Sequence, residues 1–348
     1  MKYTGIELLK KLCEINAPTG REDKVAEFVR EQTEGLCEYI PDRIGNLICL
    51  VKGEETENPV KIMISAHMDE VGFMVTGILE NGLIKVGSVG GIDPVCLSAR
   101  RVISESGVKG SIISKPIHLL TSEERGQAPK LKNLSIDVGA LTKKEAEALT
   151  FVGDYFTFDS DYQEYGNGFI KCKALDDRLG CAIMCQAIKD LCSEGIKPSV
   201  DLYFAFTCRE EVGYSGAFCA SEQIHPDYAF IIESTAVGDA YSSDSESTVA
   251  SLGNGGAISF ADRGTIYDRA FTEKLISVCK DKCIDYQMKK YVSGGNDSSH
   301  IQRSGFGVKV AVMSAPSRYI HSASCVIHKN DVESIYKALY YLIADWGK

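Results

Sequence analysis

Histidine and carboxylate side chains follow four short apolar runs of the sequence, and side chains of these types can bind metal ions or transfer protons. The runs are VKIMISA (60–66), DLYFAFT (201–207), YAFII (228–232) and VKVAVMS (308–314), each with the length and composition of a buried strand. They lead in turn to His67 and Asp69, to Glu210 and Glu211, to Glu233, and a few residues further on to His321. Asp176 and Asp177 stand just before a helical pattern. Because open α/β sheets bind ligands at the carboxyl ends of their strands, we expect these groups to lie together.

The residue types of this set are typical of a two-metal site. Zinc and cobalt accept imidazole nitrogen and carboxylate oxygen, and a shared carboxylate can hold two cations roughly 3.5–4 Å apart. His67 and Asp69 are two residues apart on a strand and so point to the same side, where Asp69 can accept the second N–H of the imidazole. Glu210 and Glu211 are adjacent and point in different directions. One of them can therefore bind metal while the other acts as general base.

Each feature also has an ordinary structural explanation. A histidine at a strand end is often only hydrogen-bonded, two adjacent glutamates usually form a solvated surface, and two aspartates before a helix often cap it. The joint placement of these residues at the predicted strand ends favours a site. A serine nucleophile is disfavoured, because Gly213-Tyr214-Ser215-Gly216 has Ala217 where a nucleophile elbow needs its second glycine.

Composition and charge narrow the class of protein. The chain has 348 residues, 44% of them hydrophobic and 25% charged, which is typical of a globular protein of about two domains. Its net charge of −10 argues against nucleic-acid binding through phosphate neutralisation. We expect no signal peptide, because the N-terminal residues alternate charged and apolar side chains as an amphipathic helix does, and no membrane span, because no run of about 18 apolar residues occurs. Thirteen cysteines without a CxxC pair indicate reduced thiols and a cytoplasmic protein.

The order of the elements predicts an α/β fold with an insertion. Helical patterns at 178–192, 268–283 and 331–346 alternate with the apolar runs and predict a largely parallel central sheet flanked by helices. Two more helices are expected at the N-terminus, the second capped by Thr19 and Glu22. Residues 72–165 are rich in glycine and β-branched residues and predict a small β-rich, barrel-like domain. This insertion divides the α/β domain into residues 1–71 and 166–348.

Eight segments carry a resemblance to a known family. They are AHMDEVGFMV (66–75), SVGGID (88–93), IDVGA (136–140), VGDYFTF (152–158), KALDDRLG (173–180), REEVGYSGA (209–217), SGGNDSS (293–299) and RYIHS (318–322). In these segments the chain resembles the dinuclear-metal aminopeptidases that include the glutamyl, deblocking and tetrahedral (TET) aminopeptidases, which are also labelled endoglucanase or cellulase M. The resemblance implies a zinc-peptidase-like mixed sheet, peptide substrates and two divalent metal ions per subunit, zinc or cobalt, with manganese as a third option. It also implies a homo-oligomer, a tetrahedral dodecamer assembled through residues 72–165.

The resemblance also assigns roles to individual residues. His67 and Glu233 would bind one metal ion, and Glu211 and His321 the other. Asp176 would bridge both ions and would be joined to Asp177 by a cis peptide bond. Glu210 would be the general base, and Asp69 would orient His67.

Three positions depart from the commoner pattern of that family. Glu233 stands where many members have aspartate, Asn296 stands where threonine usually precedes Asp297, and Ala323 replaces the proline often found after the IHS triplet. We expect the first departure to alter the metal geometry. The other two are expected near the substrate pocket, where they bear on specificity.

The resulting hypothesis is a metal-dependent aminopeptidase that hydrolyses the N-terminal peptide bond with a water molecule activated by two metal ions. Three alternatives stay open. A related metal-dependent amidase or deacylase would use the same residues, and a glycosidase would use paired carboxylates but has no need of the two histidines. A non-catalytic assembly protein would retain only the fold.

Overall fold

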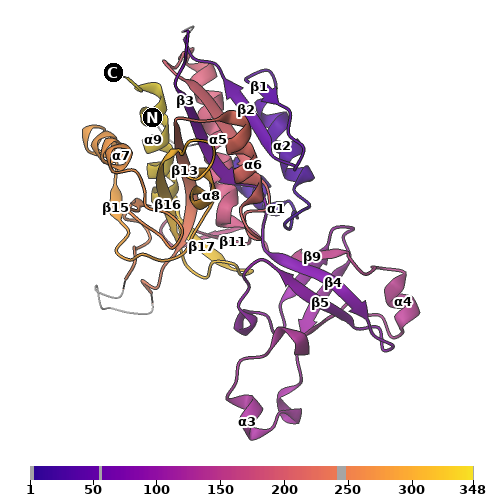
Figure 1. The fold of residues 1–348 in the computed structure, drawn as a ribbon. Coiled ribbons are helices and arrows are strands. Elements are labelled where there is room, and N and C mark those ends of the chain that lie inside the picture. Colours follow the sequence, from indigo (N-terminus) through magenta and orange to yellow (C-terminus); the bar gives the residue numbers. More distant parts are fainter. Residues whose placement is uncertain (1–3, 55–56, 241–247, 348) are drawn as a thin grey trace.

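A helix-covered mixed sheet and a separate β-barrel make up the fold (Figure 1). The structure is a computed structural model and describes residues 4–54, 57–240 and 248–347. Within these residues the large sheet has the strand order β1 (Glu38–Ile40), β2 (Leu47–Val51), β12 (Asp201–Thr207), β3 (Lys61–His67), β13 (Tyr228–Ala236), β16 (Lys309–Ser317), β14 (Gly256–Ile258) and β15 (Tyr286–Met288). The zinc-peptidase-like α/β class predicted from the sequence is confirmed.

The four central strands β12, β3, β13 and β16 are parallel, and each corresponds to one of the four apolar runs. β2 and β14 pair antiparallel with the outer members of this group, so the sheet is mixed. Strands buried on both faces carry continuous apolar sequence, which is why these runs lack the alternation of a half-exposed strand. Their parallel course brings their carboxyl ends to one edge of the sheet.

Helices cover both faces of the sheet. The larger core joins β3 and β12 to α1 (Ile6–Glu14), α2 (Asp23–Thr33), α5 (Leu175–Ser193), α7 (Arg269–Asp281) and α9 (Lys329–Ala344). On the other face, α6 (Ser215–Ile224) and α8 (Ser298–Ile301) complete a smaller core. Ile62 and Ile64 of β3 belong to the first core and Met63 to the second, as the twofold period of a strand requires. None of the described helices has both the length and the apolar composition needed to cross a membrane.

The predicted cap of the second helix is wrong. α2 begins at Asp23, and its N-cap residue Glu22 makes no side-chain capping bond. The Thr19 hydroxyl instead donates to Asp69 Oδ2 at 2.7 Å, and Glu22 Oε1 accepts the backbone N–H of Arg209 at 3.1 Å. Partners distant in sequence have replaced the local ones, so these two side chains connect the N-terminal segment to the strand ends.

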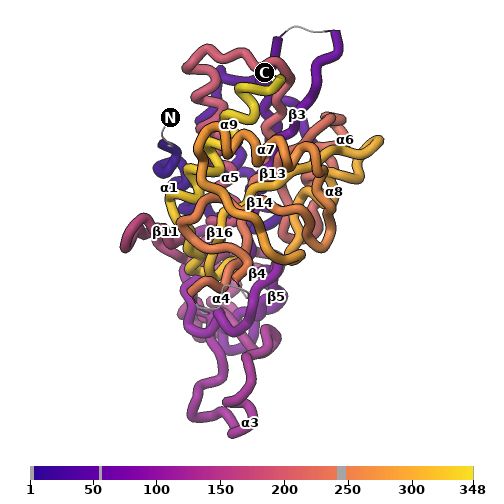
Figure 2. The backbone as a smooth tube through the Cα atoms, turned by 90° about the vertical axis from the view of Figure 1, so that its left-hand side faces the viewer, coloured from indigo at the N-terminus to yellow at the C-terminus, as the bar shows by residue number. Residues whose placement is uncertain are grey.

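The inserted barrel closes through six strands and has a core of its own. Its order is β4 (Gly72–Ile78), β5 (Ile84–Val89), β8 (Ser135–Asp137), β7 (Lys109–Ile113), β6 (Arg101–Ser104) and β9 (Tyr155–Phe158). Phe73 and Phe158 meet edge to face inside it, with ring centroids 5.5 Å apart. α4 (Lys143–Glu147) lies on its rim, and α3 (Ser122–Arg125) lies in an extension that reaches farthest from the sheet (Figures 1 and 2). The β-rich insertion expected from the sequence is therefore a barrel.

A small third sheet lies between the two bodies. It consists of β10 (Gln163–Tyr165), β11 (Phe169–Cys172) and β17 (Cys325–His328). The barrel's last strand ends at Phe158, and β10 pairs with β11, which leads directly into α5. The range 72–165 therefore contains the barrel and one strand that pairs elsewhere.

Gly180 permits the close approach of α5 to β3, and its replacement by alanine should destabilise the protein. A Cβ atom at this position would lie 2.6 Å from the Ala66 Cβ and 2.6 Å from Asp177 Oδ2. Because a packed interior accommodates such an atom only by moving backbone, we expect Gly180→Ala to lower the free energy of unfolding by about 1–3 kcal/mol. Urea denaturation followed by circular dichroism measures this change. Gly238→Ala is the control, since its Cβ would meet no atom of the described residues within 4 Å; equal effects of the two variants would contradict the packing argument.

Candidate metal centre

The carboxyl ends of the four parallel strands hold the site. His67 is the last residue of β3 and is paired in register with Thr207, the last residue of β12. Glu233 lies in β13 opposite Ser314 of β16. The remaining members follow strand ends or begin a helix: Glu210 and Glu211 after β12, His321 after β16, and Asp176 in the first turn of α5. All seven residues that the sequence analysis placed at the site, Asp69 included, lie at this edge.

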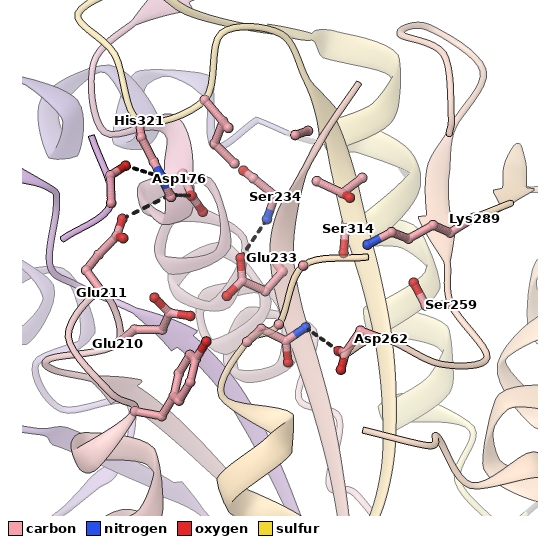
Figure 3. A pocket seen from close by; sticks show the side chains of 18 of the residues that line it. Asp176, Glu210, Glu211, Glu233, Ser234, Ser259, Asp262, Lys289, Ser314 and His321 are labelled. Atoms are coloured by element: carbon pink, nitrogen blue, oxygen red, sulfur yellow. Dashed lines mark hydrogen bonds and ion pairs between the residues drawn. The ribbon is translucent and has the colours of Figure 1, made fainter. Parts of the chain in front are cut away.

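Two groups of possible metal ligands share Asp176. In the first group, His67 Nε2 lies 3.5 Å from Asp176 Oδ1 and 3.9 Å from Glu233 Oε1. In the second, His321 Nε2 lies 3.2 Å from Asp176 Oδ2 and 3.5 Å from Glu211 Oε1. Figure 3 shows Asp176 between Glu211 and His321 on one side of the pocket. Asp176 thus offers a different oxygen to each group, which is the arrangement that a bridging carboxylate requires.

Both imidazoles present Nε2 to the carboxylates because a backbone carbonyl occupies Nδ1. His67 Nδ1 donates to the Asp69 carbonyl at 3.1 Å, and His321 Nδ1 donates to the Gly91 carbonyl at 2.8 Å. A carbonyl oxygen only accepts, so Nδ1 carries a proton and the Nε2 lone pair is left for a proton or a metal ion. Burial opposes protonation of both rings. The neighbouring carboxylates nevertheless raise the pKa of His67, and they raise that of His321 to about 9.

Asp69 connects His67 of the first ligand group with the backbone of Glu210 and Glu211. Its Oδ1 lies 3.4 Å from His67 Nδ1 and accepts the Glu210 backbone N–H at 3.1 Å. Its Oδ2 accepts the Glu211 N–H at 3.2 Å and the Thr19 hydroxyl. Burial raises the pKa of Asp69, but His67 and these donors together bring it below its ordinary value. A charged Asp69 is therefore in position to orient His67 and to fix the backbone of both glutamates.

The centre has an excess of negative charge. Burial, together with neighbouring carboxylates, raises the pKa of Glu210 and Glu233, and it raises that of Glu211 to about 7. Among the described residues, no lysine or arginine forms an ion pair with these side chains or with Asp176. Asp176 Oδ1 is buried and lacks a hydrogen-bond donor. Converging carboxylates, two imidazole Nε2 atoms directed at them, and a buried oxygen of Asp176 without a hydrogen-bond donor among the described residues fit divalent cations.

The turns that carry these residues include unusual backbone. The peptide bond between Asp176 and Asp177 is cis, as the resemblance implied. Asp177 is fully buried and accepts the N–H groups of His67 at 3.3 Å and Gly180 at 3.1 Å, which ties the start of α5 to the end of β3. His321 and Arg209 both have positive φ, at 58° and 59°. Such backbone is costly for residues with a side chain and is concentrated at functional sites.

The sequence analysis missed a buried ion pair behind the site. Lys173 Nζ lies 2.6 and 2.8 Å from the two carboxylate oxygens of Glu70, and Glu70 also accepts the Ala17 N–H at 3.0 Å. The Arg178 guanidinium donates to the Leu12 carbonyl at 2.7 Å. The available signal was the presence of charged residues inside HMDE and KALDDRLG, segments whose neighbours are apolar. These contacts join α1 and α5 to the strand that carries His67.

The barrel also contributes to the site through the SVGGID loop, to which the sequence analysis assigned no role. Gly90 and Gly91 follow β5, and a Cβ atom on Gly90 would lie 3.3 Å from the Glu211 Cβ. Gly91 supplies the carbonyl that holds His321. The glycines of SVGGID therefore allow a close backbone approach, which was the signal available in the sequence.

The ligand groups open into a cavity of about 470 Å³. Glu210, Glu211 and Glu233 line one part of it, and Ser259, Asp262 and Lys289 line another (Figure 3).

The three departures from the family pattern lie in different surroundings. Glu233 is at the centre itself. Asn296 lines the cavity, and its amide donates to the Tyr267 hydroxyl at 3.0 Å. Ala323 was also expected near the pocket. It packs instead against the barrel core and does not line the cavity.

A mixed α/β fold with paired histidine–carboxylate groups at the strand ends is typical of metal-dependent hydrolases. The chain belongs to the M42 glutamyl aminopeptidase family, whose model matches residues 45–337, and it is an aminopeptidase of this metal-dependent family. A glutamyl aminopeptidase of Lactococcus lactis is 29% identical and covers 93% of this chain and 91% of its own.

Solved structures agree in fold. An aminopeptidase from the archaeon Desulfurococcus kamchatkensis is 35% identical, with a TM-score of 0.91 over 98% of this chain and 94% of its own. The TET1 peptidase of Pyrococcus horikoshii, which can assemble into a tetrahedron or a large octahedral shell, is 33% identical. Its TM-score is 0.86 over 98% of this chain and 99% of its own.

Removal of one acceptor from Asp69 should weaken metal binding without unfolding the protein. In Asp69→Asn, the amide nitrogen cannot accept, so at least one of the donors around this side chain loses its partner. Losses at such supporting positions typically reduce metal affinity about 10- to 100-fold. Calorimetric titration with zinc measures the change. Asp281→Asn, at the end of α7 and away from the site, should bind as the wild type does; unchanged affinity in Asp69→Asn would refute the linking role.

Proposed function

We propose that the protein removes N-terminal residues from peptides with the help of two divalent metal ions, and that Glu210 is the general base. The observation that carries this proposal is the sharing of Asp176 between the His67–Glu233 group and the His321–Glu211 group. Each group supplies one imidazole and one carboxylate besides the shared one. Zinc and cobalt suit this donor set best, and manganese is the third option.

When bound, the metal ions would lower the pKa of a water molecule and polarise the scissile carbonyl. Glu210 is in position to take the proton from that water and return it to the leaving amine. Its backbone is fixed by Asp69, the residue is 8% exposed, and burial raises the pKa of its carboxyl group, which makes the carboxylate a stronger base than one in water. Glu211 lies 3.5 Å from His321 and is therefore proposed as a ligand of the second metal ion. Glu210 is then the member of the pair that remains for catalysis.

The negative charge of the centre favours a substrate with a free α-amine. An N-terminal ammonium placed beside Glu233 would be stabilised by a carboxylate that otherwise lies among like charges. This preference separates an aminopeptidase from a deacylase, whose substrates have a blocked nitrogen. A glycosidase would leave the two oriented histidines and the shared Asp176 without a role. A purely structural assembly protein would have no need for so many buried carboxylates.

We also propose that residues 72–165 mediate self-association. Leu141, Phe151 and Val152 lie close to α4 on the barrel and are 80, 63 and 63% exposed in the single chain. Phe151 and Val152 line one hollow beside α4. Exposed apolar side chains that lie together on a surface mark places where another protein surface docks. The assembly into shells of the Pyrococcus horikoshii TET1 peptidase supports a tetrahedral dodecamer for this chain.

Hydrolysis should depend on metal. Aminoacyl p-nitroanilides should be cleaved by the protein as purified, not after dialysis against a chelator, and again after zinc, cobalt or manganese is restored. The parallel assay with N-acetylated substrates should show no cleavage. Cleavage of the blocked substrates alone would favour the deacylase, and cleavage that survives complete metal removal would exclude the proposal.

Glu210→Gln should keep its metal and lose its turnover. The substitution preserves size and removes the group that accepts the proton, so we expect kcat to fall by about 10²- to 10⁴-fold. Elemental analysis should still find two metal ions per chain. Glu273→Gln, an exposed position on α7, is the control. Full activity in Glu210→Gln would transfer the role of base to another residue.

Light scattering after size exclusion should give a mass of twelve chains. Phe151→Asp places a charge in the apolar cluster of the barrel and should shift the protein to smaller species. Phe306→Asp, at an even more exposed position after α8, should leave the mass unchanged. A monomeric wild type, or equal dissociation in both variants, would remove the barrel from the assembly.

A further inference from the structure

One tyrosine that lines the cavity has no part in the reaction described so far. Tyr214 follows the two glutamates of the centre and is the N-cap residue of α6. We propose that its hydroxyl donates a hydrogen bond to the carbonyl oxygen of the scissile peptide bond and stabilises the negative charge that this oxygen gains when water adds to the carbonyl. This inference rests on the proposed aminopeptidase function and adds a catalytic residue to it.

A tight turn holds Tyr214 next to the proposed base. Its backbone N–H donates to the carbonyls of Arg209 at 3.1 Å and Glu210 at 3.3 Å. Its φ of 61° lies in the left-handed region, which is costly for a residue with a side chain and is concentrated at functional sites. The side chains of Glu210 and Tyr214 therefore leave from the same hydrogen-bonded turn.

The ring of Tyr214 is held in place, whereas its hydroxyl is free. The ring packs against that of His300, with centroids 5.1 Å apart and an angle of 39° between the planes. A Cβ atom on Gly295, which also lines the cavity, would lie 3.3 Å from the hydroxyl oxygen, so this glycine leaves room for it. Among the described residues, the hydroxyl has no hydrogen-bond partner. Because a buried tyrosine hydroxyl usually finds one, this donor is available to a substrate.

The charges around the hydroxyl indicate where in the cavity it lies. Burial raises the pKa of Tyr214 to about 12, and the carboxylates of Glu210 and Glu233 contribute the next largest effects. Figure 3 shows these two carboxylates turned toward the same part of the pocket. The hydroxyl therefore lies near both the proposed base and the carboxylate proposed to receive the substrate amine. It keeps its proton at neutral pH, as a donor must.

The other tyrosine of the cavity wall, Tyr267, has no free donor. Its hydroxyl donates to Asp262 at 2.6 Å and accepts the Asn296 amide at 3.0 Å and the Ser298 hydroxyl at 3.1 Å. These partners occupy the donor and both acceptor positions of the hydroxyl. Tyr267 thus supports the wall of the cavity, while Tyr214 presents an unused donor to its interior.

The position of the scissile carbonyl follows from the two carboxylates. With the α-ammonium beside Glu233 and the attacking water beside Glu210, the carbonyl carbon lies between them, since it is two bonds from the amine nitrogen. A hydroxyl in the field of both carboxylates is within reach of the carbonyl oxygen. Because that oxygen gains charge only as water adds, the hydrogen bond strengthens in the transition state and raises kcat. Tyr214 keeps its proton throughout, and Glu210 carries out the proton transfer.

Tyr214→Phe removes the donor and retains the ring that packs against His300. We expect kcat to fall by about 10- to 100-fold, the size of effect that a hydrogen bond to a charged oxygen has. The loss should be the same for an aminoacyl p-nitroanilide and for a dipeptide with the same N-terminal residue, because both have the scissile carbonyl. Elemental analysis should still find two metal ions per chain. Tyr165→Phe, which removes an exposed tyrosine hydroxyl from β10, should keep full activity.

Inhibitor binding separates a catalytic role from a structural one. A phosphinic pseudo-dipeptide has the tetrahedral, negatively charged group of the transition state, whereas the corresponding primary amine has the ammonium and the side chain but no carbonyl oxygen. Tyr214→Phe should raise the Ki of the phosphinic compound by the same factor by which kcat/KM falls. It should leave the Ki of the amine unchanged.

Four results would overturn the proposal: unchanged kcat in Tyr214→Phe, a loss of kcat without a loss of phosphinic binding, equal losses for the phosphinic compound and the amine, and a loss confined to the dipeptide, which would place the hydroxyl at the residue after the scissile bond. If no substrate is cleaved with any metal, the aminopeptidase function fails and calorimetry tests Tyr214 separately. The metal-loaded wild type should then still bind the phosphinic compound more tightly than Tyr214→Phe does, and equal binding would refute the role of the hydroxyl.

Discussion

The concentration of buried carboxylates at the carboxyl ends of four parallel strands is the constraint on which the rest of the structure depends. Charges of like sign in a site of low polarity repel one another and lose hydration. Asp69 keeps a lowered pKa despite its burial because His67, the Thr19 hydroxyl and two backbone N–H groups stabilise its charge. Glu210 and Glu233 accept fewer hydrogen bonds from the protein, and burial raises their pKa values. The fold therefore stabilises the charge of Asp69 with its own donors, whereas the carboxylates proposed to bind cations and substrate have fewer donors.

The need for hydrogen-bond partners around these buried side chains explains why distant segments converge on the strand ends. Thr19 belongs to the N-terminal segment and Gly91 to the barrel loop, and each supplies one group that completes the orientation of a ligand. His321 depends on the barrel in particular, because Gly91 fixes its tautomer. The second ligand group is thus built at the contact between barrel and sheet.

The strands and the residues at their ends could be predicted because their signals are local. Continuous apolar runs mark buried parallel strands, and a carboxyl end is a fixed position relative to such a run. The cap at Thr19 was predicted wrongly for the complementary reason: its partner Asp69 is 50 positions away, and a local pattern contains no information about that distance. The same limit hid the ion pair of Glu70 with Lys173. Family resemblance, not spacing, indicated that Asp176 would be shared.

The proposed metal ligands and Lys289 belong to different elements that line one cavity. The ligands lie at the ends of β3, β12, β13 and β16 and at the start of α5, where register and buried hydrogen bonds leave little freedom. Lys289 lies after the edge strand β15, held by one backbone pairing and one carbonyl. An edge position tolerates substitution with less cost to the core than the central strands do. The part of the cavity around Lys289 can therefore change while the candidate metal centre stays as it is, since Lys289 shares no hydrogen bond with the proposed ligands among the described residues.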